Sequence, residues 1–252
     1  MPTVIIDPGH GGMDPGAVYK GRQEKDDNLR LALAVGELLS QNGVDVLYTR
    51  TDDVYDSPYR KAMIANESGA DYLISFHRNA SPIAGNASGI ETLVYADRGV
   101  AAQMARDINR ELAALGFRDI GVIERPGLAV LRRSRMPAVL IETGFIDNDA
   151  DNLKFDEEFE EIAATISNGI LETLRNEGQL PDSISSVSYP PESSNNSQNE
   201  RPPSPLSDNT PASKLYRVQV GAFKNRNYAY ELNSQLTEEG FPAECRGSPP
   251  HS

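Results

Sequence analysis

The chain has 252 residues, with 24 lysines and arginines against 37 aspartates and glutamates, a formal net charge of −13 and a single cysteine. This length suits one sizeable domain, alone or with a small second one. The negative charge argues against a surface that neutralises phosphates, so we expect no nucleic-acid partner. Because Cys245 has no second cysteine to pair with, core packing or a metal must hold the fold together.

The termini and the apolar runs bear on where the protein acts. No run approaches the ~18 apolar residues of a membrane-spanning helix, so we expect no membrane span. The N-terminal sequence MPTVIIDPGH lacks the basic start and the long apolar stretch of a signal peptide. We therefore expect synthesis in the cytoplasm without a secretory signal. A protein of this kind would reach an extracellular substrate after lysis of the producing cell.

Short β-branched runs alternate with amphipathic segments through most of the chain, which predicts an α/β fold. We expect a mixed, mostly parallel twisted sheet flanked by helices. The clearest helix carries Leu31, Val35 and Leu38 at helical spacing, and Gly43 ends it. In chain order, the expected elements are a strand at 3–7, a helix at 24–42, a strand at 44–50, a helix at 59–69, strands at 70–77 and 89–97, a helix at 100–115, a strand at 137–145 and a helix at 155–176.

The composition changes sharply at residues 181–213, which hold 10 serines and 7 prolines in 33 residues. Such a segment cannot bury enough apolar surface to offset the entropy lost on ordering, so we predict a disordered linker. It separates a body at residues 1–180 from a short C-terminal segment at residues 214–252.

Ionisable residues follow or end several of the expected strands. His10 comes after the first strand, His77 ends the third, and Glu142 lies in the last, while Glu24 opens the first helix. Ligands gather at the carboxyl ends of strands in open α/β sheets. Two histidines and one carboxylate would make a three-ligand zinc set with a fourth position free, and a further carboxylate could act as general base.

Spacing alone leaves other roles open for these residues. They are scattered, with no compact metal motif of the HExxH kind. A histidine at a strand end can be purely structural, and Glu24 can be a first-turn acid favoured by the helix dipole. Glu142 is less ordinary, since a carboxylate within AVLIETGF needs a partner or a shifted pKa.

The glycine-rich loop at residues 7–17 raises the alternative of a nucleotide-dependent enzyme. Neither phosphate-binding pattern fits it. Asp14 stands where GxGxxG requires its third glycine, and Ala17 and Val18 replace the Lys and Ser/Thr that follow GxxxxG. Two aspartates in the loop would also repel phosphate, so this alternative is disfavoured.

Five segments, in this order and spacing, resemble the zinc-dependent N-acetylmuramoyl-L-alanine amidases of the Amidase_3 family. The resemblance covers about residues 3–176, and five separate segments make it far more specific than any single motif. The segments are VIIDPGHGGMDPGA, GRQEKDDNLRLA, LYTRTDD, ISFHRNAS and VLRRSRMPAVLIETGFIDN.

The resemblance implies an enzyme that hydrolyses the amide bond between N-acetylmuramic acid and L-alanine in peptidoglycan. It implies one catalytic Zn²⁺ held by His10, Glu24 and His77, with Glu142 as the catalytic acid and base. All four positions carry the residue type that the family has there. The loss of a ligand or of the catalytic acid would favour a non-catalytic peptidoglycan-binding protein instead, and none is missing.

Three further residues are candidates for substrate contacts. Asn79, two residues after His77, either orients the substrate or a ligand loop, or forms a turn. Arg132 and Arg133 belong to a basic cluster with Arg125 and Arg135. A guanidinium group can bind stem-peptide carboxylates in a bidentate manner. The alternative is a solvated loop whose charges matter little.

The C-terminal segment at 214–246 resembles the first half of a SPOR module, a small α/β unit that binds peptidoglycan strands lacking stem peptides. We expect about half of such a module in residues 214–252. Together the two resemblances predict a monomeric cell-wall amidase similar to sporulation mother-cell autolysins. A phage endolysin with the same chemistry remains the alternative, because tail modules occur on both.

Overall fold

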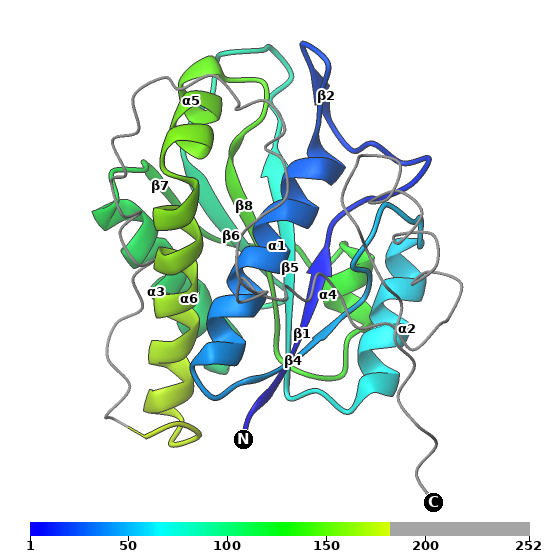
Figure 1. The fold of residues 1–252 in the computed structure, drawn as a ribbon, viewed down its shortest axis with the longest axis vertical. Coiled ribbons are helices and arrows are strands. Elements are labelled where there is room, and N and C mark those ends of the chain that lie inside the picture. Colours follow the sequence, from blue (N-terminus) through cyan, green and yellow to red (C-terminus); the bar gives the residue numbers. More distant parts are fainter. Residues whose placement is uncertain (182–252) are drawn as a thin grey trace, which may run out of the picture. The chain divides into compact units, whose positions relative to one another are not determined.

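The computed structural model describes residues 1–181, which form a six-stranded sheet with helices on both faces (Figure 1). The strand order is β4-β1-β5-β8-β6-β7. All neighbours are parallel except β6 and β8, so the expected mixed, mostly parallel α/β fold is confirmed. The strands are β1 (Thr3–Pro8), β4 (Asp45–Tyr48), β5 (Tyr72–Asn79), β6 (Ile90–Val94), β7 (Asp119–Glu124) and β8 (Ala138–Phe145). The expected C-terminal module and all but the first residue of the expected linker lie outside the described residues.

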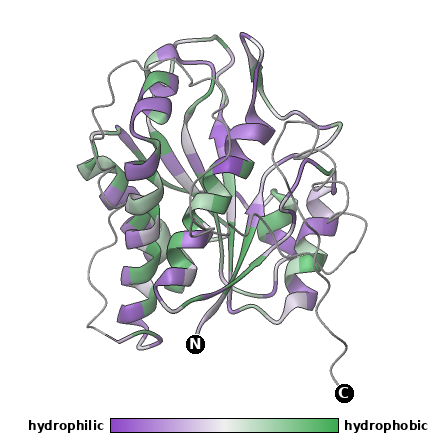
Figure 2. Cartoon of the chain, viewed as in Figure 1, coloured by the Kyte–Doolittle hydropathy of each residue, from purple (hydrophilic) through white to green (hydrophobic). Residues whose placement is uncertain are grey.

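Two hydrophobic clusters, one on each face of the sheet, form the core. The larger cluster packs three helices on the sheet: α1 (Glu24–Gln41), α3 (Gly99–Ala114) and α6 (Phe159–Asn176). The smaller cluster packs α2 (Pro58–Ser68) and α4 (Ala129–Arg133) on the opposite face. In Figure 2 these helices carry both hydrophobic and hydrophilic colour, as expected of helices with one face on a sheet. No helix in residues 1–181 combines the length and apolarity needed to cross a membrane.

The alternation of side chains along β8 determines which face of the sheet Glu142 occupies. Val139 and Ile141 belong to the larger cluster, whereas Ala138 and Leu140 belong to the smaller one. Because successive side chains of a strand point to opposite faces, Glu142 points to the face covered by α2 and α4. The same alternation in β5 places His77 on that face, since Leu73 lies there and Ile74 does not.

Local sequence explains where α2 begins and ends. The Ser57 side chain accepts a hydrogen bond from the backbone N–H of Arg60, and Pro58 occupies the first helical position. Gly69 ends the helix with a left-handed conformation (φ 75°) that glycine adopts without strain. These signals set the two ends of α2, and Lys61 near its start contacts the loop that follows β1.

The structure differs from the sequence-based expectation in three elements. The single helix expected at 155–176 is two helices, α5 (Asp149–Glu157) and α6, and Asn148 caps the first by accepting hydrogen bonds from two backbone N–H groups. The expectation missed α4, which has only five residues, and β7, a partly exposed edge strand. It also missed the two-residue strands β2 (Val18–Tyr19) and β3 (Arg22–Gln23), which pair as a hairpin before α1.

Gly169 allows α6 to lie close to α3, and replacing it should destabilise the fold. A Cβ atom at this position would lie 2.7 Å from Ile108 Cα and 2.8 Å from its backbone nitrogen. We expect Gly169→Ala to lower the free energy of unfolding by about 1–3 kcal/mol, as overpacked cores do, in a urea titration. Gly127→Ala is the matched control, because a Cβ there meets nothing within 4 Å. Equal stabilities for the two variants would contradict the close approach.

Candidate active site

His10 lies in the loop after β1 and is held by two carboxylates. Its Nδ1 atom lies 2.9 Å from Asp14 Oδ2, and its Nε2 atom lies 3.1 Å from Glu24 Oε2. The residue has a positive φ of 58°, which is uncommon outside glycine. A metal-binding histidine commonly donates its second ring N–H to a carboxylate, and Asp14 is placed to accept it. Asp14 was missed in the sequence analysis, although it stands only four residues after His10.

Glu24 opens α1, and both of its carboxylate oxygens are used. Oε2 accepts a hydrogen bond from the Ala17 backbone N–H at 2.9 Å. Oε1 accepts from Asn28 Nδ2 at 3.1 Å and from the Arg78 backbone N–H at 3.2 Å. The positive end of the helix dipole favours a carboxylate at this position. These contacts hold the buried side chain in one orientation, toward the two histidines.

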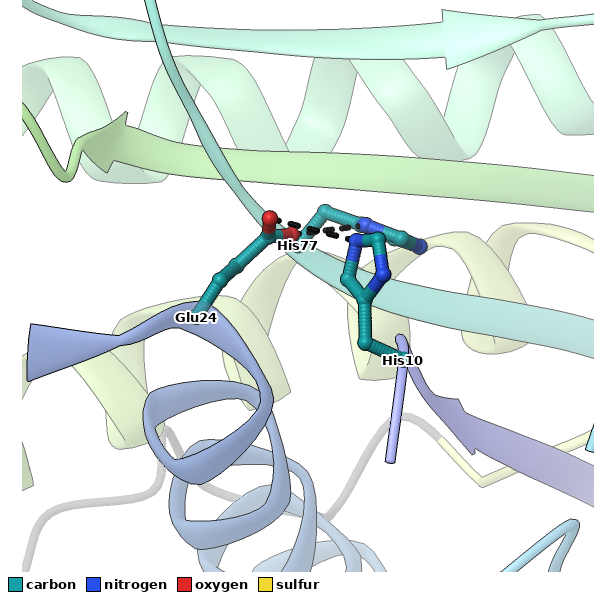
Figure 3. A group of neighbouring side chains, drawn as sticks. All are labelled: His10, Glu24 and His77. Carbon is teal, nitrogen blue, oxygen red and sulfur yellow. Dashed lines mark hydrogen bonds and ion pairs between the residues drawn. The ribbon is translucent and has the colours of Figure 1, made fainter. Parts of the chain in front are cut away.

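His77 completes a group of three side chains that converge from three different segments (Figure 3). Its Nδ1 atom lies 2.9 Å from Glu24 Oε1, and its ring meets that of His10 edge to face at 5.0 Å between centroids. One ligand atom from each of His10, Glu24 and His77 lies within 4.8 Å of the others. Two imidazole nitrogens and one carboxylate oxygen are the donor set of a catalytic zinc site with an open position.

The electrostatics of the group favour a cation at its centre. Burial would lower the pKa of His10, but hydrogen bonds and charge from Glu24 and Asp14 raise it to about 9. Burial would raise the pKa of Glu24, but both histidines hold it well below its ordinary value. Two carboxylates around two imidazoles therefore stabilise positive charge, which a proton or a metal ion can supply.

Glu142 stands beside this group on the neighbouring strand. It pairs in register with His77, on the face that His77 also occupies. Burial, together with the nearby charges of Glu24 and Glu91, raises the pKa of Glu142 to about 7, although the histidines act in the opposite direction. Its Oε2 atom is buried and has no hydrogen-bond partner among the described residues. A carboxyl group with a pKa near neutrality and a free oxygen is suited to exchange protons with a substrate.

Lys61 and Arg50, both missed in the sequence analysis, hold the loop that carries His10. The buried Lys61 ammonium group donates to the carbonyl oxygens of Pro8 and His10, and it pairs with Asp7 at 3.0 Å. Arg50 Nε donates to the Pro8 carbonyl at 3.0 Å, and its Nη2 donates to the Gly9 carbonyl at 2.9 Å. The conformation of the loop therefore depends on one side chain from α2 and on one from the segment that follows β4.

The three candidate substrate residues lie in different surroundings. Asn79 is in β5, two residues after His77, and its Nδ2 donates to Glu91 Oε1 at 2.9 Å. Arg132 and Arg133 are exposed at the end of α4, which packs on the face toward which Glu142 points. Within residues 1–181, neither arginine forms a hydrogen bond or an ion pair with His10, Glu24 or His77. A role for these three residues in binding substrate stays a prediction.

Known proteins resemble the chain over both parts. The profile of the N-acetylmuramoyl-L-alanine amidase family Amidase_3 matches residues 4–172, and the SPOR domain profile matches residues 212–250. The chain is 35% identical to the N-acetylmuramoyl-L-alanine amidase CwlM of Bacillus licheniformis, over 96% of this chain and 84% of that protein. It is 34% identical to a sporulation-specific N-acetylmuramoyl-L-alanine amidase of Bacillus subtilis, over 96% and 83%.

The fold agrees with these relatives. The crystal structure of an N-acetylmuramoyl-L-alanine amidase from Clostridium difficile 630 superposes with a TM-score of 0.67 at 37% identity, covering 70% of this chain and 98% of that one. The family profile spans β1 through most of α6, so it contains every residue of the cluster and Glu142. The chain therefore belongs to the Amidase_3 family of N-acetylmuramoyl-L-alanine amidases.

Proposed function

We propose that the protein hydrolyses the amide bond between N-acetylmuramic acid and L-alanine in peptidoglycan, and that it uses one zinc ion to do so. The observation that carries the proposal is the convergence of His10, Glu24 and His77 beside a carboxyl group with a raised pKa, Glu142. Among residues 1–181 no other group of His, Cys, Asp and Glu side chains converges in this way.

The residues present fit a zinc ion. The donor atoms are two nitrogens and one oxygen, and the backbone around them leaves no room for additional side chains. A Cβ atom at Gly9 would lie 2.5 Å from His77 Nε2, and one at Gly16 would lie 2.5 Å from Glu24 Oε2. Zinc held by these three side chains would supply Lewis acidity, polarising the scissile carbonyl and easing deprotonation of the attacking water.

Glu142 would carry the proton transfers of the reaction. Its carboxylate takes a proton from the attacking water and gives a proton to the nitrogen of the departing amine. Its burial supports this role, because a carboxyl group with a pKa near 7 can both accept and release a proton at neutral pH. Asp14 would accept the Nδ1–H of His10 and so keep the ring in a fixed orientation.

The raised pKa of Glu142 predicts how activity depends on pH. Since the carboxylate form must accept the proton, kcat/KM should fall about tenfold per pH unit below an ionisation near pH 7. A bound cation would move this ionisation toward lower pH. The measurement is hydrolysis of a soluble muropeptide between pH 4.5 and 8.5, with zinc content determined at each pH. An acid limb that only follows loss of zinc would contradict the assignment to Glu142.

We further propose that the protein is an autolysin of sporulating cells. Two relatives match 96% of this chain, a span that includes the SPOR-like segment, and one of them is named for sporulation. The SPOR-like residues 212–250 would bring the enzyme to peptidoglycan glycan strands. A phage endolysin is the second candidate. Transcription that rises during sporulation favours the autolysin, whereas transcription that rises on prophage induction favours the endolysin.

The amidase reaction itself is tested by the identity of the bond that is cut. Purified peptidoglycan is incubated with the full chain, and new amino termini and new reducing sugar ends are both measured. The proposal expects new L-alanine amino termini and no new reducing ends. New reducing ends, or amino termini of other residues, would contradict it.

A further inference from the structure

A second carboxylate, Glu91, lies on the far side of Glu142 from the metal cluster. The sheet order β1-β5-β8-β6 sets four side chains in a row: His10 after β1, His77 in β5, Glu142 in β8 and Glu91 in β6. Because β6 runs antiparallel to β8, the pairing runs from Glu91 opposite Glu142 to Val94 opposite Val139. The row therefore runs from His10 and His77 through Glu142, the proposed acid and base, to Glu91.

The two carboxylates repel each other. Directly paired residues of antiparallel strands share a face, with Cβ atoms about 4.5–5.5 Å apart, and like charges in such pairs are destabilising. The charge of Glu91 is one of the causes that raise the pKa of Glu142. Among residues 1–181 neither carboxylate forms an ion pair with a lysine or an arginine, and the buried Oε2 of Glu142 has no hydrogen-bond partner; the positive charges that act on Glu142 are those of His77 and His10, on the side away from Glu91. A positively charged group of a ligand, placed beside Glu91, would offset this repulsion.

Asn79 fixes Glu91 in its position. Its Nδ2 donates to Glu91 Oε1 at 2.9 Å, while its Oδ1 accepts from the Ala80 backbone N–H at 2.8 Å. Asn79 lies two residues after His77 in the same strand, so β5 supplies both a metal ligand and the support of Glu91. The second oxygen of Glu91 remains available to a ligand.

We propose that Glu91 binds the amino group of the L-alanine that the reaction releases, and so sets the direction in which the substrate lies. This inference rests on the proposed amidase function. Water adds its oxygen to the carbonyl carbon as the C–N bond breaks, and the products are a carboxylate and an ammonium group. The carbonyl belongs beside His10, Glu24 and His77, so the nitrogen lies toward Glu142 and Glu91. The stem peptide then extends over β6, and the glycan side lies toward β1 and α2.

The test separates recognition of the ammonium charge from a general structural effect. Zinc-loaded full-length protein is titrated by calorimetry with L-alanyl-D-glutamate and with the same dipeptide N-acetylated. We expect Glu91→Gln to weaken binding of the free-amine dipeptide by about tenfold or more, because the variant loses a hydrogen bond between two charged groups. Binding of the acetylated dipeptide should not change. Glu37→Gln, an exposed glutamate in α1, is the control that leaves both affinities as they are.

Asn79→Ala provides an independent variant, which should weaken binding of the free amine while leaving the Glu91 charge in place. An equal loss for both dipeptides, or no loss for either, overturns the role of Glu91. Wild-type protein that releases L-alanine termini from peptidoglycan, while Glu91→Gln binds both dipeptides normally, overturns this inference alone. Wild-type protein that releases no L-alanine termini overturns the proposed function and this inference with it.

Discussion

Replacing Glu142 with glutamine should lower kcat for peptidoglycan hydrolysis by about 10²- to 10⁴-fold, the usual contribution of a positioned acid or base. Glutamine keeps the shape of the side chain but can neither accept nor return the proton. The measurement is release of L-alanine amino termini at matched zinc content. Glu37→Gln, exposed on α1, is the control and should retain full activity. Activity within threefold of wild type would contradict the role of Glu142.

The same variant should be more stable than the wild type when the metal is removed. Burial and neighbouring acids raise the pKa of Glu142 from 4.5 to about 7 in the folded state. Stability is thus lost as the pH rises through that interval, and at pH 8 the loss amounts to about 3 kcal/mol. Glutamine carries no charge and should recover part of this free energy of unfolding in a urea titration at pH 8. A variant that is inactive because it has unfolded would show the opposite change.

Replacing Lys61 with methionine should have the largest effect on stability. Lys61 and Asp7 are buried, with 4% and 1% of their surfaces exposed, and they form an ion pair at 3.0 Å. Burial would raise the pKa of Asp7, but Lys61, with hydrogen bonds from Thr49 and Ser75, holds it below its ordinary value. Without the lysine an unpaired carboxylate stays in the interior, and we expect the free energy of unfolding to fall by about 3–5 kcal/mol.

The pH dependence and two further variants identify the cause. The stabilisation of ionised Asp7 is present above its unfolded pKa and is lost as the pH falls, so Lys61→Met should cost most at neutral pH and least in acid. Asp7→Asn in the Lys61→Met background should restore part of the loss. Arg60→Met is the control in α2, because Arg60 is exposed and forms only a 3.8 Å surface pair with Glu67. A loss in Arg60→Met equal to that in Lys61→Met would refute the buried pair as its source.

Sequence patterns predicted the fold class because they record local burial. The expected elements around β1, α1, β5 and β8 carry apolar residues at clear strand or helix spacing. Segments with weaker signals were missed: β7 is an edge strand with exposed residues, and α4 is too short to show a period. The break between α5 and α6 at Glu158 lies within an acidic stretch that gives no stop signal.

Sequence patterns also identify some residues of the candidate site and miss others. His10 follows a strand, and His77 and Glu142 lie in strands, so chain order and family resemblance were enough to single them out. Lys61 and Arg50 act through backbone carbonyls of a loop about 40 to 50 residues away in sequence, which no local pattern encodes. Glu91 joins the row only because β6 reverses direction beside β8, and strand order and direction depend on tertiary packing.

In the proposed mechanism His10, Glu24 and His77 hold a zinc ion that the amidase reaction requires. The most direct measurement is release of L-alanine amino termini from purified peptidoglycan by three samples of the full chain: as purified, after treatment with a chelator, and after return of zinc. We predict about one zinc per chain, activity lost with the chelator and restored with zinc, and neither bound zinc nor activity in His77→Ala. Full activity in chelator-treated protein with no detectable metal would contradict the zinc requirement.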